Sequence, residues 1–151
     1  MRLRLPSSPA RPLLHKLIAA GLSAADPYHA LLKHVVLTRH SLRLGRRTYN
    51  LSHVDRIVVV GAGKASARMA QALETALGPR LDDGLVIVKT GHTLATKQIT
   101  VLEASHPIPN RAGLHATQRL LRLTHHLTSR DLLIVLLSGG ASSLLPAPVA
   151  G

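Results

Sequence analysis

The sequence predicts an α/β fold, a Rossmann-like three-layer sandwich whose sheet is mostly parallel. Short runs of β-forming residues alternate along the chain with amphipathic helical patterns, which favours strands crossed over by helices. The run from Leu132 to Leu137 is unbroken and apolar, which is typical of a strand covered on both faces. Apolar residues make up 46% of the 151-residue chain and aromatic residues only 1%, so the core must be built from Leu, Val, Ile and Ala.

Two helices and a short strand are expected in the N-terminal third. Pro12 suits the first position of a helix that weakens around Gly21, and Asp26 caps a second helix that is predicted to end at Gly45. Residues Arg47 to Leu51 are expected to form a short edge strand. The apolar stripes of the two helices are Leu13, Leu14, Leu17 and Ile18, then Leu31, Leu32, Val35 and Val36.

A strand–helix–strand unit is predicted next. Ile57 to Val60 form its first strand, and a tight turn leads into a helix that Gly78 and Pro79 close. Leu85 to Lys89 form the second strand, and a right-handed parallel unit is the expected arrangement. The buried face of the helix is assigned to Ala65, Met69, Ala72, Leu73, Ala76 and Leu77.

The remaining elements extend the same pattern. Ile99 to Glu103 are predicted as a strand near the sheet edge, and Asn110 as the cap of a helix. The strand from Leu132 to Leu137 then leads into a loop rich in Gly and Ser, and no full helix follows it. That ending indicates an apparently truncated α/β domain, a fragment of a longer protein. The stripe of the helix is Ala116, Leu120, Leu123 and Leu127.

Charge narrows the classes of partner without naming one. The net charge is +12, of which residues 1–56 carry +8 and residues 57–151 carry +4. Such a balance suits a nucleic acid, an acidic membrane or a small anionic ligand. The scattered basic residues and the lack of stacking aromatics favour a basic surface over a nucleic-acid footprint. No apolar run is long enough to span a bilayer. Residues 1–12 are expected to be a frayed basic tail, and the lack of Cys suits a reducing compartment.

The turn Gly61-Ala62-Gly63-Lys64 is the first candidate site. It should aim backbone N–H groups of the following helix at an anion, with Lys64 adding a full charge. It is no Walker A loop, because Val58 stands where that motif needs glycine. It is also an imperfect dinucleotide fingerprint, because Ser66 occupies the third glycine position. Lys89 and Thr90 stand where a ribose-binding acid is expected, which disfavours NAD and tolerates NADP.

A second loop, Ser138 to Ser143, should lie beside this turn at the carboxyl ends of the strands. Small residues allow backbone N–H groups to approach a ligand, and hydroxyls can donate to its oxygens. The two loops therefore predict one shared site for an anionic small molecule, with Lys64 as its main counter-charge. Neither the general base nor any metal ligand can be assigned. The other candidate binding residues are Gly61, Gly63, Ser66, Lys89, His92, His106, Ser138, Gly139, Gly140 and Ser142.

Four ordered motifs resemble the glycerate 2-kinase family, whose full-length members end in a MOFRL-type domain: VVVGAGKASARMA, GLVIVKTGH, EASHPIPNRAG and DLLIVLLSGGASSLLPAPVAG. The resemblance covers residues 13–151 and implies the N-terminal part of the large domain, without the C-terminal MOFRL-type domain. It implies ATP-dependent phosphorylation of the 2-hydroxyl of D-glycerate to 2-phosphoglycerate in the cytoplasm, with Mg²⁺. It also implies that Lys64 is catalytic and that activity depends on later parts of the family's chain. Asn110 and Ala141-Ser142-Ser143 depart from the family's usual Asp and Gly-Ser-Ala.

Two other functions stay open at this point. Some members of the same family are labelled hydroxypyruvate reductase, an NADP-dependent oxidoreductase, although the poor dinucleotide fingerprint argues against it. A basic nucleic-acid-binding module is the other alternative, supported by the net charge alone.

Overall fold

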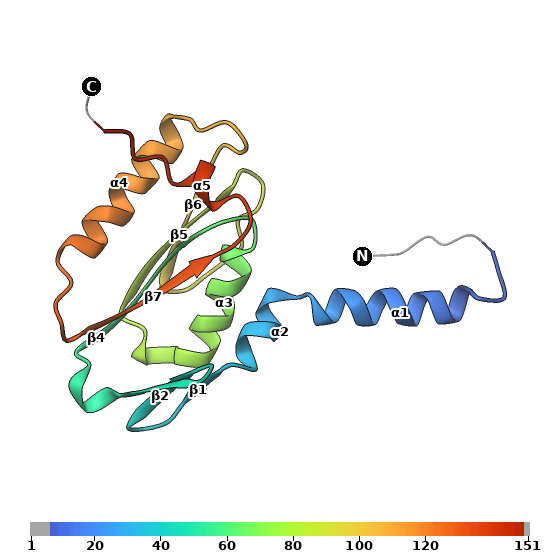
Figure 1. The fold of residues 1–151 in the computed structure, drawn as a ribbon, viewed down its shortest axis with the longest axis horizontal. Helices are drawn as coiled ribbons and strands as arrows, with labels where there is room; N and C mark the ends of the chain where they lie inside the picture. Colours follow the sequence, from blue (N-terminus) through green and yellow to red (C-terminus); the bar gives the residue numbers. More distant parts are fainter. Residues whose placement is uncertain (1–6, 150–151) are drawn as a thin grey trace.

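Four parallel strands form the main sheet, in the order β6–β5–β4–β7 (Figure 1). The computed structural model describes residues 7–149. The first six residues of the predicted basic tail lie outside that range. The sheet confirms the predicted α/β class with a parallel sheet. Its strands are β4 (Arg56–Ala62), β5 (Asp83–Lys89), β6 (Ile99–Ala104) and β7 (Asp131–Leu137).

Helices cover the two faces of this sheet and give the three layers. Helix α3 (Ser66–Leu77) lies on one face, and α4 (Arg111–His125) lies on the other with the single turn α5 (Ala141–Leu144). Alternate residues of β4 point to opposite faces, so the two layers have separate cores. The α3 side contains Ile57, Val59, Leu73, Leu77, Val86 and Leu136, and the α4 side contains Val58, Val60, Ile87, Ala116, Leu120 and Leu144.

The ends of the central helices follow the residues expected there. Gly78 ends α3 with a φ of 51°, a conformation that side chains disfavour. The Asn110 side chain caps α4 by accepting the Gly113 N–H at 3.0 Å. The link from β5 to β6 has no helix and crosses α3 instead. There the Glu74 carboxylate accepts the N–H groups of Lys97, Gln98 and Ile99.

The N-terminal third differs from the prediction in one respect. Helices α1 (Arg11–Ala24) and α2 (Pro27–Leu32) form as expected, with Asp26 capping α2 through the Tyr28 N–H. Helix α2 stops at Leu32, however, so its expected continuation to Gly45 is wrong. The alternating pattern from Val35 onward forms an antiparallel hairpin instead, and a third strand completes a small sheet. Its strands are β1 (Val35–Leu37), β2 (Ser41–Leu44) and β3 (Arg47–Asn50), followed by the 3₁₀ turn η1 (Leu51–His53).

Helix α1 extends away from the rest of the protein (Figure 1). None of its residues is buried, and Leu13 and Leu17 are 60% and 61% exposed. Helix α2 instead packs on α3, where Arg68 pairs with Asp26 at 3.0 Å. None of the helices in residues 7–149 has the length and apolarity that crossing a bilayer requires.

Strand β7 is the other departure from expectation. It was predicted to be covered on both faces, but it lies at the edge of the sheet with β4 as its only paired neighbour among residues 7–149. Leu133, Val135 and Leu137 are 37%, 52% and 59% exposed on the α4 side. Only the one-turn α5 follows β7, as expected, so no helix of residues 7–149 covers that half of the face.

Candidate functional site

The two predicted loops lie side by side at the carboxyl ends of β4 and β7. We call Gly63 to Ala65 the lysine loop and Ser138 to Gly140 the serine loop. The strands that carry them are paired neighbours, with Ala62 opposite Leu137. The order β6–β5–β4–β7 reverses its direction of winding between these two strands. Open parallel sheets bind ligands at this switch point, because the loops on either side of it diverge.

Hydrogen bonds join the two loops directly. The Lys64 N–H donates to the Gly139 carbonyl at 3.0 Å, and the Ala65 N–H donates to Ser138 Oγ at 3.0 Å. The Ser138 N–H in turn donates to the Ala62 carbonyl at 3.1 Å. The predicted juxtaposition of the loops is therefore confirmed. The lysine-loop amides are nevertheless already bonded to protein, so the expectation that they point at an anion is wrong for Lys64 and Ala65.

Three of the candidate binding residues serve this packing. A side chain at Gly61 would overlap the Leu136 carbonyl, and one at Gly63 would overlap Ser138. Ser66 is fully buried, and its hydroxyl donates to the Leu136 carbonyl at 3.4 Å. The structure thus uses Gly61, Gly63 and Ser66 to bring the two loops together.

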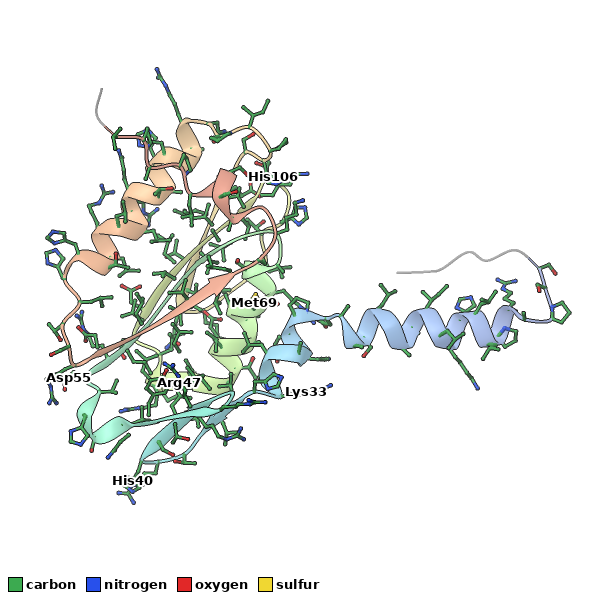
Figure 2. All side chains as sticks on the ribbon, viewed as in Figure 1. Lys33, His40, Arg47, Asp55, Met69 and His106 are labelled. Carbon is green, nitrogen blue, oxygen red and sulfur yellow. The ribbon has the colours of Figure 1, made fainter. Side chains whose placement is uncertain are left out.

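Lys64 and His106 both lie near Gly140. A Cβ atom built on Gly140 would lie 2.9 Å from His106 Nε2 and 3.6 Å from Lys64 Cε. Figure 2 shows His106 beside α5, at the opposite end of the sheet from Asp55. Gly140 also has a φ of 91°, so this position excludes a side chain on two grounds. A cation and an imidazole therefore both lie next to backbone that carries no side chain.

The serine loop has several unused hydrogen-bond donors next to Lys64 and His106. Within residues 7–149, the N–H groups of Gly139 and Gly140 donate to no protein acceptor. Ser138 Oγ accepts the Ala65 N–H, which leaves its own proton for another acceptor. Ser142 is exposed in the one-turn α5. Backbone amides and hydroxyls around a lysine suit a phosphate or carboxylate.

The last two candidates lie one strand away, at the carboxyl end of β5. Lys89 is half-buried, and the exposed His92 follows in a turn closed by its N–H donating to the Lys89 carbonyl at 2.9 Å. Within residues 7–149, neither side chain has a hydrogen bond or ion pair to Lys64 or His106. They belong to the same edge of the sheet, but the structure does not join them to the two loops.

All seven carboxylates of the chain act in the scaffold. Three pair with arginines, at 2.8 Å for Asp131 with Arg56, and the other four accept backbone N–H groups. The Arg56 guanidinium and the Thr128 N–H hold the pKa of Asp131 well below its usual value. Residues 7–149 contain no group of three side chains suited to a metal ion. The carboxylates are Asp26, Asp55, Glu74, Asp82, Asp83, Glu103 and Asp131.

Sequence reasoning missed a hollow beside this site. Its volume is about 370 Å³, and it lies between the start of α4 and the segment after α5. Arg111 is its one cation among the described residues. The pattern of the sequence does not reveal it, because its walls come from segments more than thirty residues apart; only the helix-capping Asn110 marked one of them. It is lined by Pro109, Asn110, Arg111, Leu114, Pro146 and Pro148.

Comparison with known proteins finds one matching family model. The model is described as a domain of unknown function (DUF4147), and it matches residues 13–151. The chain is 37% identical over 140 residues to an Agrobacterium vitis protein named “Putative hydroxypyruvate reductase”, covering 92% of this chain and 28% of that one. It is 36% identical over 110 residues to the D-glycerate 2-kinase of Thermotoga maritima, covering 72% and 26%.

Solved structures agree with the fold. A crystal structure of a Pyrococcus horikoshii protein superposes with a TM-score of 0.83 at 28% identity, covering 97% of this chain and 33% of that one. The chain thus spans about a quarter to a third of the length of the relatives it matches.

Proposed function

The chain belongs to the DUF4147 family, and from that premise we propose that it forms part of a kinase that phosphorylates D-glycerate. The reaction transfers the γ-phosphoryl group of ATP to the 2-hydroxyl and yields 2-phosphoglycerate and ADP. The name of the Thermotoga relative supports this assignment. The chain covers a minor part of such relatives, so the proposal concerns only the residues that this chain would contribute to the active site.

The observation that carries the proposal is the position of Lys64. Its side chain lies at the sheet's switch point, next to a loop with free amides, and it forms none of the ion pairs found in residues 7–149. An exposed cation beside the start of a helix is unfavourable unless an anion balances it. A phosphoryl group or a glycerate carboxylate supplies that anion.

The geometry suits phosphoryl transfer because this reaction needs positioning and positive charge more than covalent help from the protein. Lys64 would stabilise charge on the transferring group. The Gly139 and Gly140 amides and the Ser138 and Ser142 hydroxyls would donate to oxygens of the bound anions. Lys89 and His92 would contact the more distant end of the substrates.

The proposed kinase uses ATP and Mg²⁺ and acts in the cytoplasm. Mg²⁺ commonly keeps waters and substrate phosphates as its ligands. The carboxylates described above are engaged in the scaffold and do not fit a protein-built magnesium site. We therefore assign no residue of this chain to the metal.

Substitution of Lys64 tests the proposal. ADP release is measured with ATP, Mg²⁺ and D-glycerate on the full gene product. Lys64→Ala should lower kcat at least about 100-fold, because it removes the charge at the transferring group. Lys97→Ala is the matched control and should leave kcat unchanged, since Lys97 is exposed and its N–H binds Glu74 outside the site. Equal turnover in both variants would remove Lys64 from the mechanism, and no turnover in the unaltered protein would remove the proposed reaction.

A hydroxypyruvate reductase is the second candidate, favoured by the name of the Agrobacterium relative. Against it, Ser66 stands at the third glycine position of the dinucleotide fingerprint, although Lys89 at the end of β5 would tolerate the extra phosphate of NADP. Titration with NADPH, followed by cofactor fluorescence, separates the two. The reductase requires saturable binding, and the kinase requires none.

A further inference from the structure

We propose that His106 is the general base that removes the proton of the glycerate hydroxyl. This assignment rests on the proposed kinase function and adds the group that the sequence left unassigned. It follows from which side chains the fold leaves free at the site and where it places them.

Transfer to an alcohol requires an acceptor for the hydroxyl proton, and kinases often use a carboxylate for it. In this chain each carboxylate accepts a hydrogen bond from an arginine or a backbone N–H. None of these contacts involves Lys64 or His106. Lys64 is a cation, and the loop hydroxyls are far too weakly basic. Within residues 7–149, His106 is the imidazole packed on the serine loop beside Lys64, and imidazole is the side chain that most often serves as a general base.

The position of His106 suits this task. Its ring packs against Gly140 at the place that a Cβ atom would need, which Lys64 also approaches. Its side chain is half-buried, and neither ring nitrogen has a hydrogen-bond partner among the described residues. Its Cδ2–Nε2 edge lies 2.7 and 2.9 Å from the place of the missing Gly140 Cβ, and Lys64 Cε lies 3.6 Å from the same place. A substrate held by Lys64 therefore brings its hydroxyl within reach of that nitrogen.

The step balances as follows. His106 Nε2 takes the proton of the 2-hydroxyl, and the oxygen forms a bond to the γ-phosphorus of ATP. The bond between that phosphorus and the β–γ bridging oxygen breaks, and ADP leaves with the electron pair. The imidazolium then returns its proton to water. Lys64 stabilises the negative charge that builds on the phosphoryl oxygens.

The candidate residues with ionisable side chains at the same edge of the sheet as His106 are Lys64, Lys89 and His92. The segment of His106, from Ser105 to Asn110, contains no other titratable side chain, and neither does the stretch from Ser138 to Ser143. From the β4 side the facing charge is Lys64. A general base at His106 should give the kcat profile an acidic limb that is absent from His106→Asn.

Kinetics of two histidine variants supply the first test. His106→Asn should lower kcat about 100-fold, leave the KM for D-glycerate within about twofold, and abolish the acidic limb of the kcat profile. His40→Asn is the control, because Figure 2 places His40 at the opposite end of the protein. Equal melting temperatures would show that both variants fold. An active protein in which His106→Asn keeps the wild-type kcat and acidic limb would overturn the assignment and leave the kinase proposal standing.

Nuclear magnetic resonance gives a second test that needs no turnover. The His106 ring resonance is identified from its loss in His106→Asn, and the protein is titrated with D-glycerate and with 3-hydroxypropionate, which lacks the 2-hydroxyl. A base bonded to that hydroxyl should respond to D-glycerate and at least fivefold less to the analogue. An equal response to both would show an anion-binding histidine, and no response to either would show an uninvolved one. Both of these outcomes would overturn the proposal.

Discussion

At the scale of single residues, the lack of a side chain at Gly140 leaves room for His106 and Lys64 beside the serine loop. The Gly140 φ of 91° is unfavourable for residues with a side chain, and His106 Cδ2 lies 2.7 Å from the place of the missing Gly140 Cβ. Gly139 is its neighbour, but a Cβ built there meets open space. The sequence marks both glycines as equal members of one loop, and only the fold tells them apart.

This difference predicts the outcome of two alanine substitutions. Gly140→Ala should destabilise the protein by about 1–3 kcal/mol, because it combines backbone strain with displacement of His106. Gly139→Ala should change the free energy of unfolding by less than about 0.5 kcal/mol. Urea unfolding of the two variants checks this, and equal losses would show that the His106 contact does not constrain the loop.

At the scale of secondary-structure elements, hydrogen bonds outside the sheet ladder join β4 and β7 at both ends of the strand pair. The carboxyl ends are joined by the two loops of the site. The amino ends are joined by Arg56 and Asp131, whose side chains form hydrogen bonds of 2.9 and 2.8 Å. The Asp131 side chain is only 2% exposed, so this pair is better shielded from water than a usual surface ion pair. The strand register that aligns the lysine and serine loops depends both on the hydrogen bonds between these loops and on the Arg56–Asp131 pair.

The low pKa of Asp131 predicts a loss of stability in acid. Arg56 lowers the folded-state pKa below the unfolded value of about 3.9, so the stabilising effect is present above about pH 4. It is lost as the pH falls through the folded-state pKa. Asp131→Asn should lower the urea midpoint at pH 7 and flatten its decline between about pH 4 and 2. Asp83→Asn is the control, since its carboxylate accepts only the Gly84 N–H. A decline as steep in Asp131→Asn as in the unaltered protein would contradict this role.

At the scale of the whole molecule, the described chain leaves two apolar surfaces uncovered. One is the α4-side face of β7, and the other is the stripe of α1 that contains Leu13 and Leu17. Contiguous exposed apolar surface and an open strand edge favour association. The layers near the site are by contrast closely packed.

This difference in burial predicts that replacing Val by Thr destabilises the protein much less at Val135 than at Val59. Val135 is 52% exposed, so Val135→Thr should change stability by less than about 0.5 kcal/mol and reduce binding of a hydrophobic dye. Val59 is fully buried in the α3-side core, so Val59→Thr should cost about 1–3 kcal/mol. Unfolding and dye fluorescence measure both effects. Equal destabilisation would mean that β7 is covered in solution.

Much of the fold could be predicted because it depends on local patterns. The four central strands, the helices α3 and α4, the Asn110 cap and the Gly78 end all follow from periodicity and from residues with restricted backbone preferences. The prediction failed at Val35 and at β7. In each case an apolar run fits more than one structure, and pairing or covering by distant segments decides between them.

The sequence by itself determined that this protein has a parallel α/β sheet with two glycine-rich loops and a lysine in the first. Strand and turn preferences are properties of short segments, so they can be recognised without the rest of the chain. Only the tertiary structure decided that the lysine-loop amides are used by Ser138 and Gly139 and that His106 meets Lys64 at Gly140. Those contacts join residues far apart in sequence, and they depend on the order in which the strands pair.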